Sequence, residues 1–243
     1  MLDDRAQLPA WQFELSSRAN PFVLDQLSRR LYPRAKRCLD VLISVVLLIV
    51  LAPLMLALAI AIRLDSPGPV IYLQRRGGLN GRIFDFYKFR SMTNGHDHTQ
   101  EHRKFAEAYL NGHAVASQRD DKGNIIYKPA SNGDQVTRVG RWLRSTSLDE
   151  LPQLVNVVKG DMSLVGPRPS MDYEVAMYTD RHRQRLAVTP GLTGWAQING
   201  RSNLSFDQIV SLDLEYITRR SFHGDVSIFL ATIPAVLSAK DAG

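Results

Sequence analysis

Residues 41–62 read VLISVVLLIVLAPLMLALAIAI, a run of 22 residues with no charged side chain and with Pro53 near its middle. As a single α-helix the run would extend over about 33 Å, enough to cross the ~30 Å hydrocarbon core of a bilayer. Pro53 argues against a straight span, because proline removes a backbone donor and clashes with the preceding turn, at a cost of about 3 kcal/mol. We therefore expect two helical arms, 41–52 and 53–62, each too short to cross alone.

Basic residues flank the apolar run on both sides. Before it stand Arg29, Arg30, Arg34, Lys36 and Arg37; after it stand Arg63, Arg75, Arg76, Arg82, Lys88 and Arg90, against only Asp65 and Asp85. Lys and Arg next to a membrane segment mark its cytoplasmic side. Because both ends carry that mark, the sequence favours a re-entrant helix that bends at Pro53 and returns to the same face. A spanning helix and the buried core helix of a soluble protein are the alternatives.

The composition is that of a folded, mostly water-facing protein. Of the 243 residues, 44% are hydrophobic and 22% are charged, which is ordinary for a globular chain. Cys38 is the only cysteine, so no intramolecular disulfide can form. The net charge of +6 suits nucleic acid, anionic lipid headgroups or a phosphorylated substrate. Lipid headgroups account for the basic residues around the apolar run without any nucleic acid.

The chain is predicted to have three parts. Residues 1–32 form an N-terminal extension with a short amphipathic helix, 33–64 form the re-entrant membrane helix, and 65–243 form a small cytosolic, membrane-associated domain. Within this domain, the polar segment 93–135 reads as an excursion with a helix near 101–110. The expected fold class is mixed α/β and mostly helical.

Alternating apolar residues and breakers predict a β-hairpin and several surface helices in the cytosolic domain. Strands are expected at 70–73 and 83–90, separated by the Gly-rich turn 77–81. Helices are expected at 147–159 and 171–186, and from residue 206 onward.

The densest candidate constellation is Asp149 beside Glu150 at the expected start of a helix. A helix N-terminus attracts anions and lowers the pKa of a carboxyl group, keeping it ionised as a nucleophile or metal ligand. The alternative is structural, because Ser147 and Glu150 have the spacing of a capping box, in which Glu150 only satisfies a backbone donor. Spacing alone leaves both interpretations open.

Four basic residues are candidates for binding phosphate: Lys88, Arg90, Arg144 and Arg168. Arginine forks bind phosphate oxygens in a bidentate manner, whereas lysine acts as a point charge. Arg168 lies between Pro167 and Pro169, whose stiff backbone lowers the entropy cost of aiming its side chain. The alternative for each residue is a solvated or lipid-facing basic surface.

A histidine-rich cluster, His96, His98, Glu101 and His102, has side chains of the type that bind zinc. The segment is polar and reads as an exposed excursion without a cysteine or a clear fourth ligand. We do not expect a metal site there.

Six strings in this order resemble one family. They are 65–70 (DSPGPV), 87–92 (YKFRSM), 136–141 (VTRVGR), 147–154 (SLDELPQL), 159–169 (KGDMSLVGPRP) and 189–197 (TPGLTGWAQ). Together they resemble the bacterial sugar transferases of the monotopic phosphoglycosyl transferase family, from about Pro33 to the C-terminus. Any one string alone would be a weak match, but six in order are highly specific.

The resemblance implies transfer of a sugar 1-phosphate from a UDP-sugar to polyprenyl (undecaprenyl) phosphate, with release of UMP, at the cytoplasmic face of the bacterial inner membrane. It implies Mg²⁺ and a covalent intermediate on the first residue of the acidic pair, here Asp149, which is also the expected metal ligand. Glu150 stands beside it as the second catalytic residue. The family places functional basic residues where Lys88, Arg144 and Arg168 stand. The implied role is to begin exopolysaccharide, capsule or O-antigen type glycans.

The chain departs from the family pattern at the bend of the membrane helix. The family breaks that helix near a Ser-Pro pair, and this chain has Ala52-Pro53, so the serine hydroxyl is not available to the freed backbone. The chain resembles the short catalytic-core form, without the extra N-terminal membrane helices of larger relatives.

Two other classes of function stay open from the residues. One is a membrane-anchored protein that binds polyprenyl phosphate without chemistry, and the other is a basic, membrane-tethered nucleic-acid binder. We expect no nucleic acid and expect contact with inner-membrane phospholipid. The sugar, the glycan pathway and the oligomeric state, a homo-oligomer included, are left open by the sequence.

Overall fold

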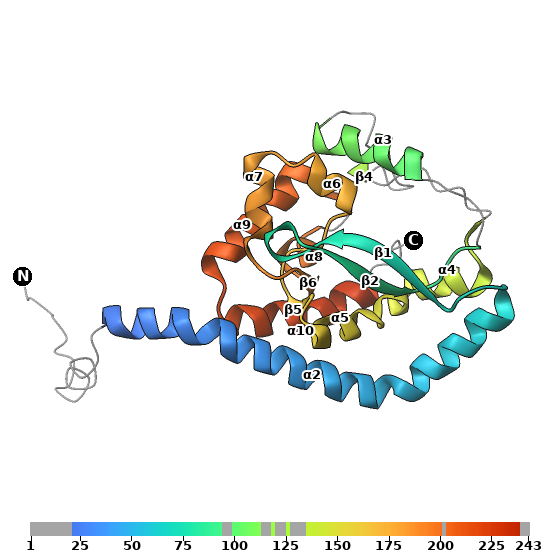
Figure 1. Ribbon diagram of the computed structural model, residues 1–243, viewed down its shortest axis with the longest axis horizontal. Coiled ribbons are helices and arrows are strands. Elements are labelled where there is room, and N and C mark those ends of the chain that lie inside the picture. Colours follow the sequence, from blue (N-terminus) through green and yellow to red (C-terminus); the bar gives the residue numbers. More distant parts are fainter. Residues whose placement is uncertain are drawn as a thin grey trace, which may run out of the picture. The chain divides into compact units, whose positions relative to one another are not determined.

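The computed structural model describes residues 21–93, 99–112, 118–119, 125–126, 135–200 and 203–238 (Figure 1). The chain divides into two compact units, residues 1–39 and 40–243, and each is considered by itself. The described residues are mostly helical with small two-stranded sheets, as the sequence predicts.

Helix α2, Pro21–Asp65, contains the apolar run and continues through Pro53 without interruption. The break into two arms is therefore not seen, although the helix is curved within residues 40–65 (Figure 1). By length and composition the stretch Leu31–Asp65 suffices to cross a membrane, and only 11% of its most apolar window is buried. That exposure weighs against the core-helix alternative, since such a helix would be mostly covered. The re-entrant path stays a prediction.

One face of α2 packs on the rest of the larger unit. Ser44, Leu58 and Ile62 are buried there, and Asp40 accepts a hydrogen bond of 2.7 Å from the hydroxyl of Ser163. The opposite side exposes large apolar side chains: Leu42, Ile43, Val46, Ile49, Val50, Leu54, Leu56, Ile60 and Leu64.

The predicted β-hairpin is confirmed. Strand β1, Ile71–Gly77, pairs antiparallel with β2, Ile83–Phe89, and is longer than expected. The turn contains a short 3₁₀ helix, η1, Leu79–Gly81, in which Asn80 adopts φ 54°, a left-handed conformation that asparagine tolerates. Phe86 is fully buried, which sets one face of β2 into the core.

The main core lies where β2 meets helix α5, Gln153–Lys159, and strand β5, Ser163–Val165. Strand β5 pairs in parallel with β6, Gly191–Thr193, a contact that the sequence reading did not anticipate. A Cβ atom on Gly191 would lie 2.1 Å from the Gly166 backbone nitrogen, so only glycine permits this approach.

Several of the remaining elements extend this core, and others build two further apolar clusters (Figure 1). They are α3 Thr99–Leu110, β3 Gln118–Arg119, β4 Ile125–Ile126, α4 Arg138–Ser145, η4 Leu148–Glu150, α6 Asp172–Ala176, α7 Asp180–Arg183, η5 Gln184–Ala187, α8 Trp195–Ile198, α9 Phe206–Arg219 and α10 Phe222–Ser238.

The expected helix at 171–186 is wrong in its continuity. It is divided into α6, α7 and η5, because the hydroxyl of Thr179 accepts a hydrogen bond from the His182 backbone and begins a new helix. The expected helix at 147–159 is likewise divided into η4 and α5.

Candidate active site

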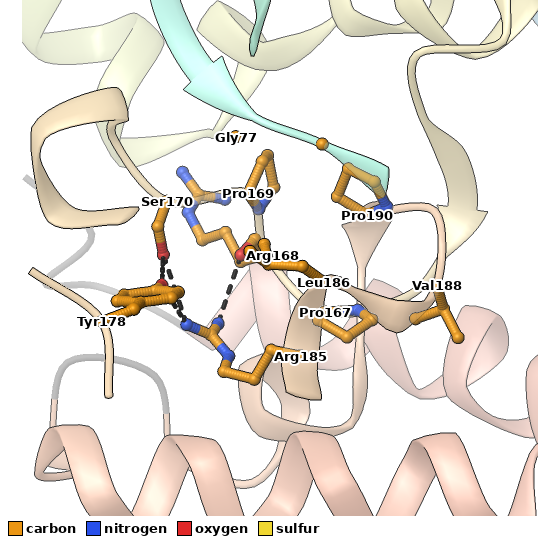
Figure 2. Close-up of a pocket in the computed structure, with 11 residues that line it drawn as sticks. Gly77, Pro167, Arg168, Pro169, Ser170, Tyr178, Arg185, Leu186, Val188 and Pro190 are labelled. Atoms are coloured by element: carbon orange, nitrogen blue, oxygen red, sulfur yellow. Dashed lines mark hydrogen bonds between the residues drawn. The ribbon is translucent and has the colours of Figure 1, made fainter. Parts of the chain in front are cut away.

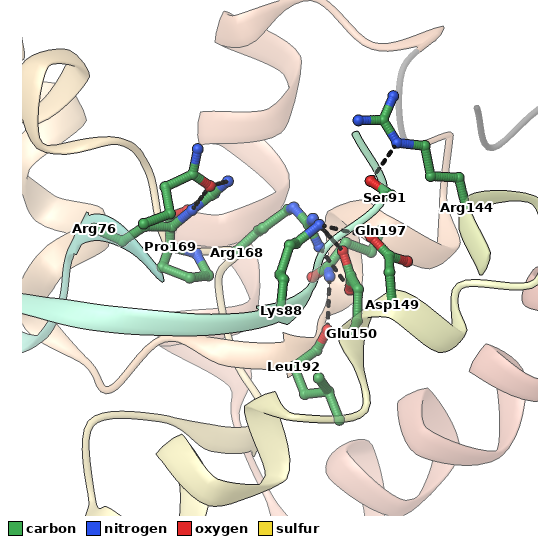
Figure 3. Close-up of polar contacts among 11 residues, drawn as sticks. Arg76, Lys88, Ser91, Arg144, Asp149, Glu150, Arg168, Pro169, Leu192 and Gln197 are labelled. Atoms are coloured by element: carbon green, nitrogen blue, oxygen red, sulfur yellow. Dashed lines mark hydrogen bonds and ion pairs between the residues drawn. The ribbon is translucent and has the colours of Figure 1, made fainter. Parts of the chain in front are cut away.

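Asp149 and Glu150 lie on the 3₁₀ turn η4, opposite Lys88 on β2 (Figure 3). The Lys88 Nζ atom is 3.3 Å from Asp149 Oδ2 and 3.1 Å from Glu150 Oε1, so one cation bridges both carboxylates. Lys88 and the acidic pair, which belong to two distant segments of the chain, thus lie in contact.

Arg168 binds the same glutamate from the loop that follows β5 (Figure 3). Its NH2 atom is 2.6 Å from Glu150 Oε1, and its NH1 atom is 3.3 Å from Glu150 Oε2. This is the bidentate geometry in which a guanidinium group binds an oxyanion. Pro167 and Pro169 flank the arginine in the loop, outside any helix or strand.

The pKa values of the two carboxyl groups are shifted in opposite directions. Burial raises the pKa of Asp149, and the charge of Lys88 only partly offsets it. Burial also tends to raise the pKa of Glu150, but Arg168 and Lys88 outweigh it and hold that pKa well below its usual value. The expectation that a helix N-terminus lowers the pKa of Asp149 is therefore wrong, because burial dominates at this three-residue turn.

The capping-box interpretation of Glu150 is also wrong. Ser147 adopts φ 56°, a left-handed conformation, and its side chain makes no capping hydrogen bond. The Glu150 carboxylate is instead directed to Lys88 and Arg168.

Arg144 lies on α4, Arg138–Ser145, and its Nε atom donates a 2.9 Å hydrogen bond to the hydroxyl of Ser91. Burial lowers the pKa of Arg144, and the charge of Asp149 opposes that shift. The two side chains therefore interact electrostatically. Helix α4 can approach Ser91 because Gly140 has no Cβ atom. A Cβ atom there would lie 2.0 Å from the Ser91 carbonyl oxygen.

The structure places Arg90 apart from the other predicted phosphate ligands. It is 4% exposed, and its guanidinium donates to the Pro67 carbonyl at 2.8 Å and to the Ser66 carbonyl at 2.6 Å. Arg90 therefore holds the segment after α2 against the hairpin. The sequence predicted Arg90 as a phosphate ligand from its positive charge, which does not reveal that its partners are main-chain carbonyls.

Two arginines that sequence reasoning did not single out as site residues support the Arg168 loop. Arg76 of β1 donates to the Pro169 carbonyl and lies over the ring of Phe86, 4.6 Å from its centre. Arg185 donates to the Arg168 carbonyl at 3.3 Å.

Arg185 is itself held in a buried network beside a small pocket (Figure 2). Its Nε atom is 2.7 Å from Asp213 Oδ2, and its NH1 atom donates to the Tyr178 hydroxyl at 2.7 Å and to Ser170 Oγ at 3.2 Å. No local spacing links these positions, so only the tertiary structure brings them together.

Asp149 retains a carboxylate oxygen for a ligand. Its Oδ1 atom has no hydrogen-bond or ion-pair partner among the described residues. Mg²⁺ takes one or two carboxylates together with substrate phosphates, so the Asp149 carboxylate fits this ion. In the described part of the chain, no three His, Cys, Asp or Glu side chains gather into a metal site. His96 and His98 lie outside the described residues.

A family model described as "Bacterial sugar transferase" matches residues 31–239. The chain belongs to this family. Curated relatives agree with the match. One is "Galactosyl transferase CpsE" of Streptococcus agalactiae, 41% identical over 86% of this chain and 43% of the relative.

Two further relatives differ in their length. "UDP-glucose:undecaprenyl-phosphate glucose-1-phosphate transferase" of Xanthomonas campestris is 38% identical over 86% of this chain and 40% of its own length. "Exopolysaccharide production protein ExoY" of Rhizobium meliloti is 36% identical over 92% of this chain and 96% of its own length. The chain thus spans less than half of the two longer relatives and nearly all of the shorter one.

Proposed function

We propose that this protein transfers a sugar 1-phosphate from a UDP-sugar to polyprenyl phosphate and releases UMP. The observation that carries the proposal is the Asp149 carboxylate, which keeps one oxygen unengaged beside the Lys88 and Arg168 cations. The names of relatives support the reaction class. They differ over glucose and galactose, so the sugar is left open.

The proposed chemistry is two displacements at one phosphorus atom. In the first, an oxygen of Asp149 bonds to the phosphorus that carries the sugar, and the bond to the UMP oxygen breaks, with its electron pair leaving on UMP. In the second, a phosphate oxygen of the lipid bonds to that phosphorus and the bond to Asp149 breaks. A carboxylate nucleophile divides one difficult transfer into two easier ones.

The cations beside Asp149 suit this chemistry, because both substrates are anions. Arg168 presents a planar fork suited to phosphate oxygens, and Lys88 presents a point charge. Glu150 holds both cations next to Asp149, with distances of 3.1 Å to Lys88 and 2.6 Å to Arg168. We assign Glu150 the role of positioning these cations, and we assign Arg144 to the anionic part of a substrate.

Mg²⁺ would be held by Asp149 and by substrate phosphates. When bound, the ion neutralises charge that develops on the phosphate oxygens.

The lipid substrate stays in the bilayer, so we propose that α2 keeps the catalytic domain at the cytoplasmic face of the inner membrane. A re-entrant α2 predicts that cysteines introduced near residues 30 and 70, in a Cys38→Ser background, are labelled from the same side of the membrane. Labelling from opposite sides would establish a spanning helix. The proposed cellular role is the first step of exopolysaccharide or related glycan assembly, in keeping with the relative named for exopolysaccharide production.

The covalent mechanism is tested by incubating the enzyme with UDP-sugar and Mg²⁺ in the absence of lipid. Intact mass and peptide mapping should show a sugar phosphate on Asp149. Asp149→Asn keeps the shape of the side chain and should abolish both the adduct and UMP release. Asp85→Asn, which changes an exposed aspartate on β2, is the matched control and should retain both.

An adduct on another residue, or normal turnover by Asp149→Asn, would falsify the covalent mechanism. Lipid binding without UMP release from any UDP-sugar would instead favour the non-catalytic polyprenyl-phosphate binder.

A further inference from the structure

Asn156 of α5 forms a two-point contact with the backbone of β2. Its Nδ2 atom donates to the Asp85 carbonyl at 2.7 Å, and its Oδ1 atom accepts from the Tyr87 backbone nitrogen at 3.0 Å. The side chain is fully buried. In the described sheet β2 pairs only with β1, and residues 85 and 87 share one parity of the strand. The amide thus binds the edge of β2 that a third strand would bind.

This contact connects the two segments that build the carboxylate site. Lys88 is the residue after Tyr87, and α5 begins three residues after Glu150. The backbone carbonyl of Asn156 accepts hydrogen bonds from the backbone nitrogens of Gly160 and Asp161, at 3.1 and 3.0 Å. These bonds fix the end of α5. One residue therefore ties the strand of the cation to the helix behind the carboxylates.

The register of β2 determines where the Lys88 side chain goes. A slip of one residue turns every side chain of a strand to its other face. Two hydrogen bonds to alternate residues resist such a slip, and a buried carbonyl or N–H group left without a partner is costly. Apolar contacts of Leu154 and Val157 hold α5 against the core but carry no directional information about β2.

We propose that Asn156 is a positioning residue that holds Lys88 within reach of Asp149 and Glu150. The inference rests on the proposed function only in taking the carboxylate cluster as the site of UMP release. It assigns no contact between Asn156 and substrate.

The first test is a double-mutant cycle on initial rates of UMP release, with Asn156→Ala and Lys88→Arg singly and combined. Asn156→Ala should lower the rate roughly tenfold in the wild-type background, a coupling of the size seen between residues that act together. In the Lys88→Arg background it should have much less effect, because that lysine is no longer there to be positioned. Equal factors in both backgrounds would overturn the proposal.

The second test does not depend on activity. Lys88 is 20% exposed in its side chain and ion-paired, whereas Lys104 on α3 is exposed. An amine-reactive reagent followed by peptide mapping should label Lys88 weakly in the wild type. It should label Lys88 several-fold more in Asn156→Ala, with Lys104 labelling unchanged. Asn111→Ala, at an exposed asparagine, is the matched control and should leave both values unchanged.

If Asn156→Ala fails to accumulate, Asn156→Asp provides a nearly isosteric variant that keeps the acceptor for Tyr87 and loses the donor to Asp85. If neither variant folds, or if labelling of Lys88 and Lys104 rises together, Asn156 serves folding alone and the proposal is wrong. Coupling without an adduct on Asp149 would retain the positioning role while rejecting the covalent mechanism. An adduct on Asp149 without coupling between Asn156 and Lys88 would support the covalent mechanism and reject the positioning role.

Discussion

Two arginine–carboxylate pairs adjoin the 167–170 loop, and they differ in their access to water. The Arg168 and Glu150 side chains are 37% and 19% exposed, whereas those of Arg185 and Asp213 are 4% and 2% exposed. Arg185 reaches the loop through its backbone, at the Arg168 carbonyl. Arg168 extends its own side chain to the carboxylate site.

Burial, more than residue type, distinguishes these two ion pairs, and we propose that only the accessible pair acts on substrate. The Arg185–Asp213 pair has its hydrogen-bonding capacity taken up by Tyr178, Ser170 and the main chain. The Arg168–Glu150 pair has few further protein partners and stays accessible to an anionic ligand. The buried pair should therefore govern stability, and the accessible pair should govern catalysis.

Breaking the buried pair should have the largest effect on stability. Asp213→Ala leaves the Arg185 charge buried without its partner and should lower the free energy of unfolding by about 3–5 kcal/mol. Chemical unfolding in detergent measures the loss. Asp207→Ala, on the same helix with an Asp side chain 69% exposed, is the control and should cost less than about 1 kcal/mol. Equal losses for the two variants would remove the distinction between the pairs.

Altering the accessible pair should affect the rate. Arg168→Lys keeps the charge but replaces a bidentate fork with a point charge. Loss of charge-assisted hydrogen bonds worth about 1.5–3 kcal/mol predicts a 10- to 100-fold lower rate of UMP release at subsaturating donor. The unfolding midpoint should change little. A near-wild-type rate would reduce Arg168 to surface charge.

Arg90 is a third case. It was predicted to bind phosphate, but its side chain binds main-chain carbonyls instead. Arg90→Lys cannot satisfy the carbonyls of Ser66 and Pro67 together and should lower stability by about 1–3 kcal/mol. The rate per folded molecule should be nearly unchanged. Arg82→Lys, at an exposed arginine of the same hairpin, is the control. A selective loss of UMP release without loss of stability would return Arg90 to the substrate-binding group.

The smallest expected effect concerns pH. Since burial raises the pKa of Asp149, adduct formation should fall with decreasing pH at values above the ordinary range of an aspartate. The charge of Glu150 raises that pKa further. Glu150→Gln should therefore shift the acidic fall in adduct yield modestly towards lower pH, in whatever activity remains. Adduct yield measured across pH tests both directions. A shift of this acidic fall towards higher pH in Glu150→Gln would contradict the electrostatic assignment.

Features that depend on neighbouring residues could be predicted from the amino-acid sequence. Alternation with a Gly-rich turn predicted the hairpin, and the apolar composition of residues 41–62 predicted a helix there, but not its continuity through Pro53. The resemblance carried by the ordered motifs implied that Asp149, Glu150, Lys88 and Arg168 share one site. Local patterns suffice for these features, because a strand, a helix and a short motif are each defined within a few residues.

The tertiary structure was needed for the features that depend on contacts between distant residues. It placed Arg90 on main-chain carbonyls, joined Arg185 to Asp213, and brought Asn156 against the edge of β2. It also reversed the expected direction of the Asp149 pKa. These hydrogen bonds join residues 23 to 71 positions apart in the chain, so no local pattern can specify them.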